Sequence, residues 1–180
     1  MSKFHQASRL NMQAFANEGA TLHDTILLQK MERLAQETQA LAPDSSVSWQ
    51  AKAELRPGAG SEESAWLHLQ AKTSLLLVCQ RCMTPVATPL EVDQWYRFVA
   101  TEEVAMAQDD DAEEDLLVMS PDLDLLAVLE DELLMALPLV PMHTQCPVAP
   151  VLQAGEDALV AEVSEKPNPF AVLSALKAKK

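Results

Sequence analysis

Residues 74–86 read SLLLVCQRCMTPV. An apolar run ends there in a Cys-x-x-Cys corner formed by Cys79 and Cys82, and a second strand-like run begins after Pro85. This pattern predicts two β-strands joined by a tight turn. Two thiols three positions apart on such a turn can face the same side of the backbone, where they either bind one metal ion or pair with each other.

A second pair of candidate ligands, His143 and Cys146, has the same spacing far downstream. Zinc prefers four tetrahedral nitrogen and sulfur ligands, often supplied as two short pairs on turns. Cys79, Cys82, His143 and Cys146 match that ligand count and pairing, so zinc is one hypothesis. The alternatives are reduced thiols that pack as small apolar groups, or a redox pair. A thioredoxin-like role is disfavoured, because the corner closes a β-turn and does not open a helix.

Residues 47–99 predict an antiparallel meander around this corner. Alternating apolar and polar residues over 47–55 indicate a strand with one wet face, and the segments 66–78 and 86–99 predict two more strands. The apolar end of the second segment is expected to be covered on both faces. We assign the aromatic side chains Trp95, Tyr96 and Phe98 to the core.

Two helices are expected to cover this sheet, which gives an α+β fold. Apolar residues recur at intervals of three and four over residues 22–41, whereas residues before 20 suggest at most a short edge strand. A second helix is predicted over 121–137, with Ser120 as its N-cap and Pro121 in its first turn. Glu130 on this helix either pairs with Arg81 or is solvated.

The net charge of the 180-residue chain is −14, which disfavours nonspecific binding to phosphate backbones. Acidic residues concentrate over 101–115, which predicts a solvated loop or, alternatively, a phosphate mimic that docks on a basic protein. Three cysteines do not form a secreted disulfide framework, and neither an export signal nor a membrane span is visible. A cytoplasmic location is therefore expected.

Residues 1–165 are predicted to form a single domain, followed by a mobile tail over 166–180 that contains a short amphipathic helix. The tail contains a basic cluster in this acidic chain. It either docks on a partner or folds back on the domain. The candidate docking residues are Phe170, Leu173, Lys177, Lys179 and Lys180.

Three motifs together resemble the YceD family: CQRC at 79–82, EDELLMALPLVPMH at 130–143 and KPNPFAVL at 166–173. The resemblance implies a non-enzymatic role in the accumulation of large-subunit (23S) ribosomal RNA, with the pre-ribosomal large subunit as partner. It leaves open whether the contact is with RNA or with a basic ribosomal protein, and it implies no small-molecule substrate. Several relatives carry additional cysteines where this chain has His143 and Cys146. The alternative function is a zinc- or thiol-based enzyme or redox sensor that uses Cys79, Cys82, His143 and Cys146.

Overall fold

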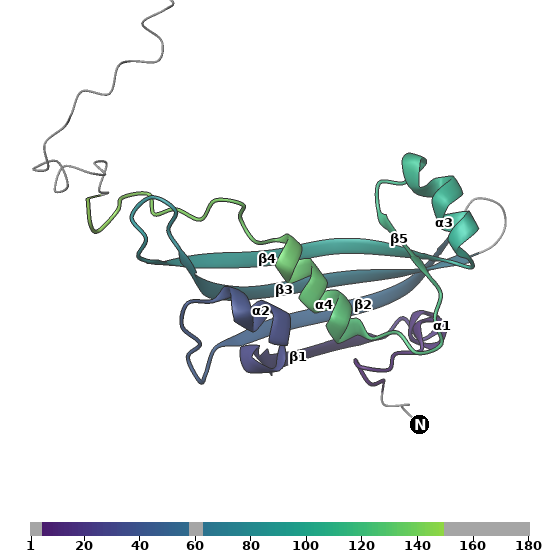
Figure 1. The fold of residues 1–180 in the computed structure, drawn as a ribbon. Coiled ribbons are helices and arrows are strands. Elements are labelled where there is room, and N and C mark those ends of the chain that lie inside the picture. The colour runs from purple at the N-terminus through teal and green to yellow at the C-terminus, as the bar shows by residue number, and fades with distance from the viewer. Residues whose placement is uncertain (1–4, 58–62, 150–180) are drawn as a thin grey trace, which may run out of the picture.

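The computed structural model describes residues 5–57 and 63–149, which share one sheet and one hydrophobic core (Figure 1). The strands are β1 (Thr21–Leu27), β2 (Ser46–Pro57), β3 (Glu63–Val78), β4 (Pro85–Val99) and β5 (Asp115–Val118), and they lie in this order across the sheet. Neighbouring strands from β1 to β4 are antiparallel, and β5 is parallel to β4. The predicted antiparallel α+β fold is therefore confirmed in outline.

One face of the sheet is apolar, because most alternate residues along each long strand are buried. In β2 and β3 these residues include Val47, Ala51, Leu67 and Leu69, and the cross-strand pair Ala51↔Leu69 sets the register. Three helices contribute buried side chains to this core: α1 (Met12–Asn17), α2 (Glu32–Glu37) and α4 (Leu125–Met135). Figure 1 shows α4 lying across the middle of the sheet.

The helix predicted over 121–137 is confirmed as the shorter α4. It begins after Asp124, not after Ser120, because the Asp124 carboxylate accepts hydrogen bonds from the backbone N–H groups of Leu126 and Ala127. Its leucines at intervals of four, Leu125, Leu129 and Leu133, are fully buried. The apolar stripe therefore fixed which side of α4 packs on the sheet.

The helix predicted over 22–41 is wrong. Most of its first half is the strand β1, which pairs with β2 through Leu22↔Ala51 and Ile26↔Val47. A 3₁₀ turn over Leu28–Lys30 and the short helix α2 follow it. The apolar residues of this segment fit a helical repeat, yet β1 satisfies the backbone groups along the edge of β2, and that tertiary pairing overrides the local pattern.

Two further segments differ from the prediction. Residues 5–19 form no edge strand and contain α1, whose first turn is capped by the side chain of Asn11. The acidic run over 101–115 is not a plain loop: it forms α3 (Glu102–Gln108) and a 3₁₀ turn over Asp109–Asp111. Thr101 caps α3, which buries none of its residues, so its acids Glu102 and Glu103 are solvated as expected. Glu114, later in the run, is not: its side chain is 16% exposed and pairs with Arg97.

The opposite face of the sheet is open to solvent and polar. Tyr96 and Phe98 lie in the core as predicted, but Trp95 points to this open face. Its ring stacks on His68 at a centroid distance of 4.1 Å, and the Arg56 guanidinium lies 3.9 Å from its centroid. Leu76 is 38% exposed on the same face, so the end of β3 is not covered on both sides.

The described helices include none that is long and apolar enough to cross a membrane.

Candidate metal centre

The first two candidate ligands lie on the turn that joins β3 to β4. Its backbone is closed by the Cys79 N–H, which donates to the Thr84 carbonyl at 3.0 Å, and by the Met83 N–H, which donates to the Cys79 carbonyl at 2.9 Å. Met83 adopts φ 59°, a left-handed conformation that is rare outside glycine. The turn is thus held in a strained shape that places Cys79 and Cys82 together.

The other two ligands arrive on the segment that follows α4. Pro138 and Pro141 prevent the helix from continuing, and the Pro141 carbonyl accepts a hydrogen bond from the Gln80 N–H at 2.9 Å. That bond ties the segment to the β3–β4 turn. Two residues later the N–H of His143 points at the sulfur of Cys79, at 3.5 Å.

The ligand atoms of Cys79, Cys82, His143 and Cys146, called here the Cys/His cluster, all lie within 4.8 Å of one another. The two sulfurs of Cys79 and Cys146 are 4.0 Å apart, and the sulfur of Cys82 is 3.5 Å from Nδ1 of His143. Zinc–sulfur bonds of about 2.3 Å in a tetrahedron separate two sulfur ligands by about 3.8 Å. The donor set and its spacing therefore fit a tetrahedral zinc ion.

Arg81, inside the Cys-x-x-Cys corner, holds the second pair in place. Its Nε donates to the sulfur of Cys146 at 3.0 Å, and its Nη2 donates to the carbonyls of His143 and Thr144 at 2.8 and 3.4 Å. Three thiolates and a neutral histidine around Zn²⁺ would carry one net negative charge, which the guanidinium would balance. Neither alternative for Glu130 holds: it does not pair with Arg81 and it is not solvated, because its side chain is 13% exposed and contacts Arg33 at the N-terminus of α2.

The surroundings of Cys79 favour its thiolate. Burial of this residue opposes ionisation, but backbone N–H donors of His143, Arg81 and Cys82 outweigh burial and lower the pKa of Cys79 to about 5. The thiolate in turn acts on the histidine, since a side-chain hydrogen bond with Cys79 raises the pKa of His143. A metal ion must therefore displace a proton from this pair.

The pKa values of the remaining two thiols, Cys82 and Cys146, shift in opposite directions. A hydrogen bond with the Thr84 hydroxyl, at 3.1 Å, lowers the pKa of Cys82. Burial raises the pKa of Cys146, against the opposing effect of Arg81. All three cysteines are free thiols in this structure. No disulfide therefore ties up any of the three sulfurs.

The predicted ligands are brought together, whereas Arg81 and Thr84 were missed as their partners. The position of Arg81 between the two cysteines was a usable signal, because it places a cation on the same turn as both thiols. Nothing in the sequence marked Thr84. The predicted docking residues, Phe170, Leu173, Lys177, Lys179 and Lys180, lie outside the described residues.

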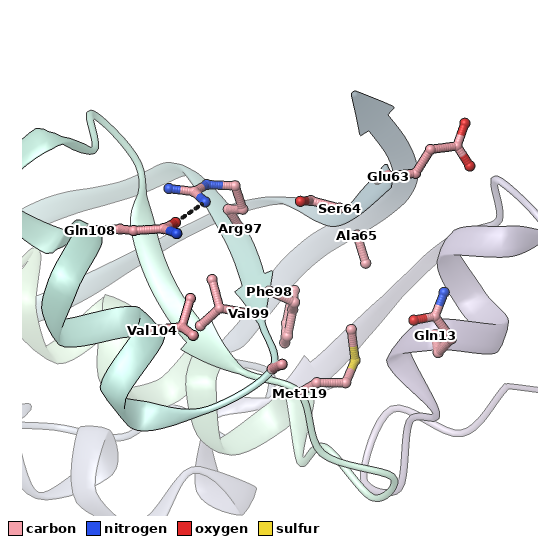
Figure 2. Close-up of a pocket in the computed structure, with 11 residues that line it drawn as sticks. Gln13, Glu63, Ser64, Ala65, Arg97, Phe98, Val99, Val104, Gln108 and Met119 are labelled. Atoms are coloured by element: carbon pink, nitrogen blue, oxygen red, sulfur yellow. Dashed lines mark hydrogen bonds between the residues drawn. The ribbon is translucent and has the colours of Figure 1, made fainter. Parts of the chain in front are cut away.

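A separate cleft of about 370 Å³ lies next to the C-terminal end of β4, beside α3. Figure 2 shows its wall: Val99, Val104 and Met119 form an apolar floor, and Arg97 donates to the Gln108 side chain at 2.7 Å. Arg97 also pairs with Glu114. Its charge is therefore satisfied within the protein, and the lining residues do not converge on a common point as the Cys/His cluster does.

Comparison with known proteins agrees with the motifs. The family model described as "Large ribosomal RNA subunit accumulation protein YceD" matches residues 67–177. A protein of that name from Haemophilus influenzae is 41% identical over 112 residues, which cover 57% of this chain and 60% of the relative. The match thus spans less than two thirds of the relative's length. No solved structure matches the chain.

Proposed function

Because the chain belongs to the YceD family, we propose that it acts as a non-enzymatic factor for the accumulation of large-subunit ribosomal RNA. The match over residues 67–177 supports this proposal, since it includes both halves of the Cys/His cluster and most of the tail. The family is named for an accumulation role and not for a reaction.

The Cys/His cluster holds a structural zinc ion in this proposal. Four protein ligands fill a tetrahedral zinc shell, and catalytic zinc sites instead keep one position open for water or substrate. The ion would pin the β3–β4 turn to the segment after α4. It would thereby fix the path of the chain between α4 and residue 149.

The tail over 166–180 contacts the pre-ribosomal large subunit. Its basic residues Lys177, Lys179 and Lys180 are suited to RNA phosphates, and Phe170 and Leu173 supply apolar anchors. Truncation after residue 165 should abolish co-sedimentation with large-subunit precursors and leave the far-ultraviolet circular dichroism of the domain unchanged. Normal co-sedimentation of the truncated protein would contradict this role for the tail.

The function itself is tested by deleting the gene. Loss of the protein should reduce large subunits relative to small subunits in sucrose gradients and lower the amount of 23S RNA. Re-expression of the wild-type chain is the control. Unchanged subunit profiles would refute the proposal. Crosslinking in cells, read out for both RNA and protein, separates the two classes of contact.

The zinc proposal has its own test. Protein purified without chelators should contain one zinc per chain by mass spectrometry under native conditions, and Cys82→Ser should lose it. The matched control is Ser74→Ala, an outward-facing polar residue on the same hairpin. A metal-free wild-type protein with normal stability and normal support of RNA accumulation would remove zinc from the mechanism.

A further inference from the structure

The outer edge of β4 is long and largely unpaired. β5 pairs with β4 only from Tyr96 to Val99, whereas β4 begins at Pro85. Among residues 5–57 and 63–149 no other strand lies beside this edge, and Figure 1 shows it free between the end of α4 and β5. A row of backbone groups is therefore available there to a strand from another chain.

The direction of these backbone groups follows from β5. The Met119 N–H donates to the Val99 carbonyl at 2.8 Å, so the backbone groups of Val99 face the β5 side. Successive residues of a strand direct these groups to opposite sides, so those of Trp95, Asp93 and Glu91 also face outward. The row of outward-facing N–H donors ends at Glu91, because the next outward-facing residue toward the start of β4 is Pro89, which has no N–H.

A shallow hollow of about 250 Å³ lies between this edge and the end of α4. Glu91 and Asp93 form one side of it, and Glu132 and Met135 form the other. The Met135 side chain is 69% exposed. The hollow therefore offers an apolar contact next to free backbone groups.

The hollow is acidic. The side chains of Glu91 and Asp93 are 67% and 65% exposed. Their partners are Lys72, at 3.2 Å from Glu91, and His68, at 2.6 Å from Asp93. Glu132 has no Lys, Arg or His within ion-pair distance in the described part of the chain. In the described residues, Lys72 and His68 are thus the basic partners of two of these carboxylates, and Glu132 has none.

We propose that an extended, lysine- or arginine-rich segment of a partner protein adds to the sheet as a further strand beside residues 91–95. Its outward-facing cations would meet Glu91 and Asp93, and side chains on its other face would contact Met135 and Glu132. The inference rests on the proposed function and deepens it, because it assigns a basic protein component of the large subunit to this edge.

Charge decides which partner fits. Acidic side chains on an edge strand prevent two copies of this chain from pairing, since the chain carries a net charge of −14. The same charges attract a basic strand and repel the phosphates of RNA. The edge is therefore closed to self-association and to nucleic acid, but open to a basic peptide.

The test uses the full-length protein and a fluorescein-labelled ten-residue peptide that alternates lysine and valine. Glu91→Pro removes an outward N–H without breaking a hydrogen bond to β3, and Glu91→Gln removes the charge but keeps the N–H. We expect the proline variant to weaken binding by roughly tenfold or more and the glutamine variant by a few-fold, as measured by fluorescence anisotropy. Equal binding by wild type and Glu91→Pro would overturn the proposal.

Hydrogen exchange provides a measurement that needs no variant. Peptide binding to the wild-type protein should slow exchange at the amides of Glu91, Asp93 and Trp95. A peptide of equal charge with proline at every second position cannot form a strand, so it should give no protection. Tight binding of that peptide, or equal protection by a single-stranded RNA, would show that the edge is not a site for strand addition.

The outcome is separable from that of the proposed function. If the peptide fails to protect the edge while the deletion strain still lacks large subunits, strand addition is wrong and the function stands. If the subunit profiles are normal, the proposed function is wrong whatever the peptide does.

Discussion

Replacement of Glu130 should destabilise the domain by an amount that follows from its contacts. One oxygen of this carboxylate accepts hydrogen bonds from the N–H groups of Arg33 and Leu34, at 2.8 and 3.1 Å, in the first turn of α2. The other oxygen accepts from the Arg33 guanidinium at 3.2 Å. The Glu130 side chain is 13% exposed, so water cannot replace these contacts freely.

In the Glu130→Ala variant two backbone donors at the start of α2 lose their acceptor, which costs about 2–3 kcal/mol in the free energy of unfolding. We add nothing for the Arg33 ion pair, because that side chain is 51% exposed and screened by water. Glu130→Gln keeps an oxygen that can accept the N–H bonds, so it should cost about 1 kcal/mol.

Urea unfolding followed by circular dichroism measures both values. Glu37→Gln is the matched control, since it removes one exposed acid at the C-terminal end of α2, the helix that Glu130 contacts. It should change the free energy of unfolding by less than about 0.5 kcal/mol. A Glu130→Ala variant as stable as this control would refute the assigned role of Glu130.

Three other predictions concern the Cys/His cluster and the core. Arg81→Met should weaken zinc binding by about 10- to 100-fold in chelator competition, with Arg81→Lys in between, because the guanidinium supports the Cys146 thiolate; equal affinities would contradict this. Without metal and under reducing conditions, the stability that the Cys79 thiolate provides should be fully present above about pH 8.5 and lost as the pH falls through about 5, because its folded pKa lies below the unfolded value. The difference in unfolding free energy between wild type and Cys79→Ser should therefore shrink with falling pH, and a constant difference would refute the thiolate. Leu129→Ala, at a fully buried position, should cost about 2–5 kcal/mol in urea unfolding, and a loss below 1 kcal/mol would show that the site collapses around the cavity.

The long strands were predictable because apolar and polar residues alternate strictly over 47–55, a pattern that fits a strand and not a helix. The four members of the Cys/His cluster were predictable for another reason: cysteine is scarce in this chain, and its two locations share one spacing. Residues that combine a distinctive chemistry with a fixed spacing can be assigned before any tertiary contact is known.

The segment over 22–41 could not be predicted, because its apolar residues satisfy a helical repeat and β1 lacks a regular apolar alternation. The choice depends on β2, which offers a free edge to Leu22 and Ile26. The contacts of Glu130 could not be predicted for a similar reason. Its partner Arg33 is remote in sequence, and α2 had to form before its N-terminus could attract a carboxylate.

Residue 95 shows a third limit. Trp95 and Tyr96 are adjacent aromatics, yet the pleat directs them to opposite faces of the sheet. Composition alone placed both in the core. A count of alternation from Val92, which is buried, would have placed Trp95 outside.

The β3–β4 hairpin also acts as a spacer. β4 has 15 residues, which at about 3.3 Å each separate its ends by about 50 Å. The Cys/His cluster lies at one end and the acidic helix α3 at the other (Figure 1). Sites so far apart share no contacts, so free-energy changes from substitutions at the two ends should add. Each end can thus be altered by mutation while the other serves as an internal reference for folding.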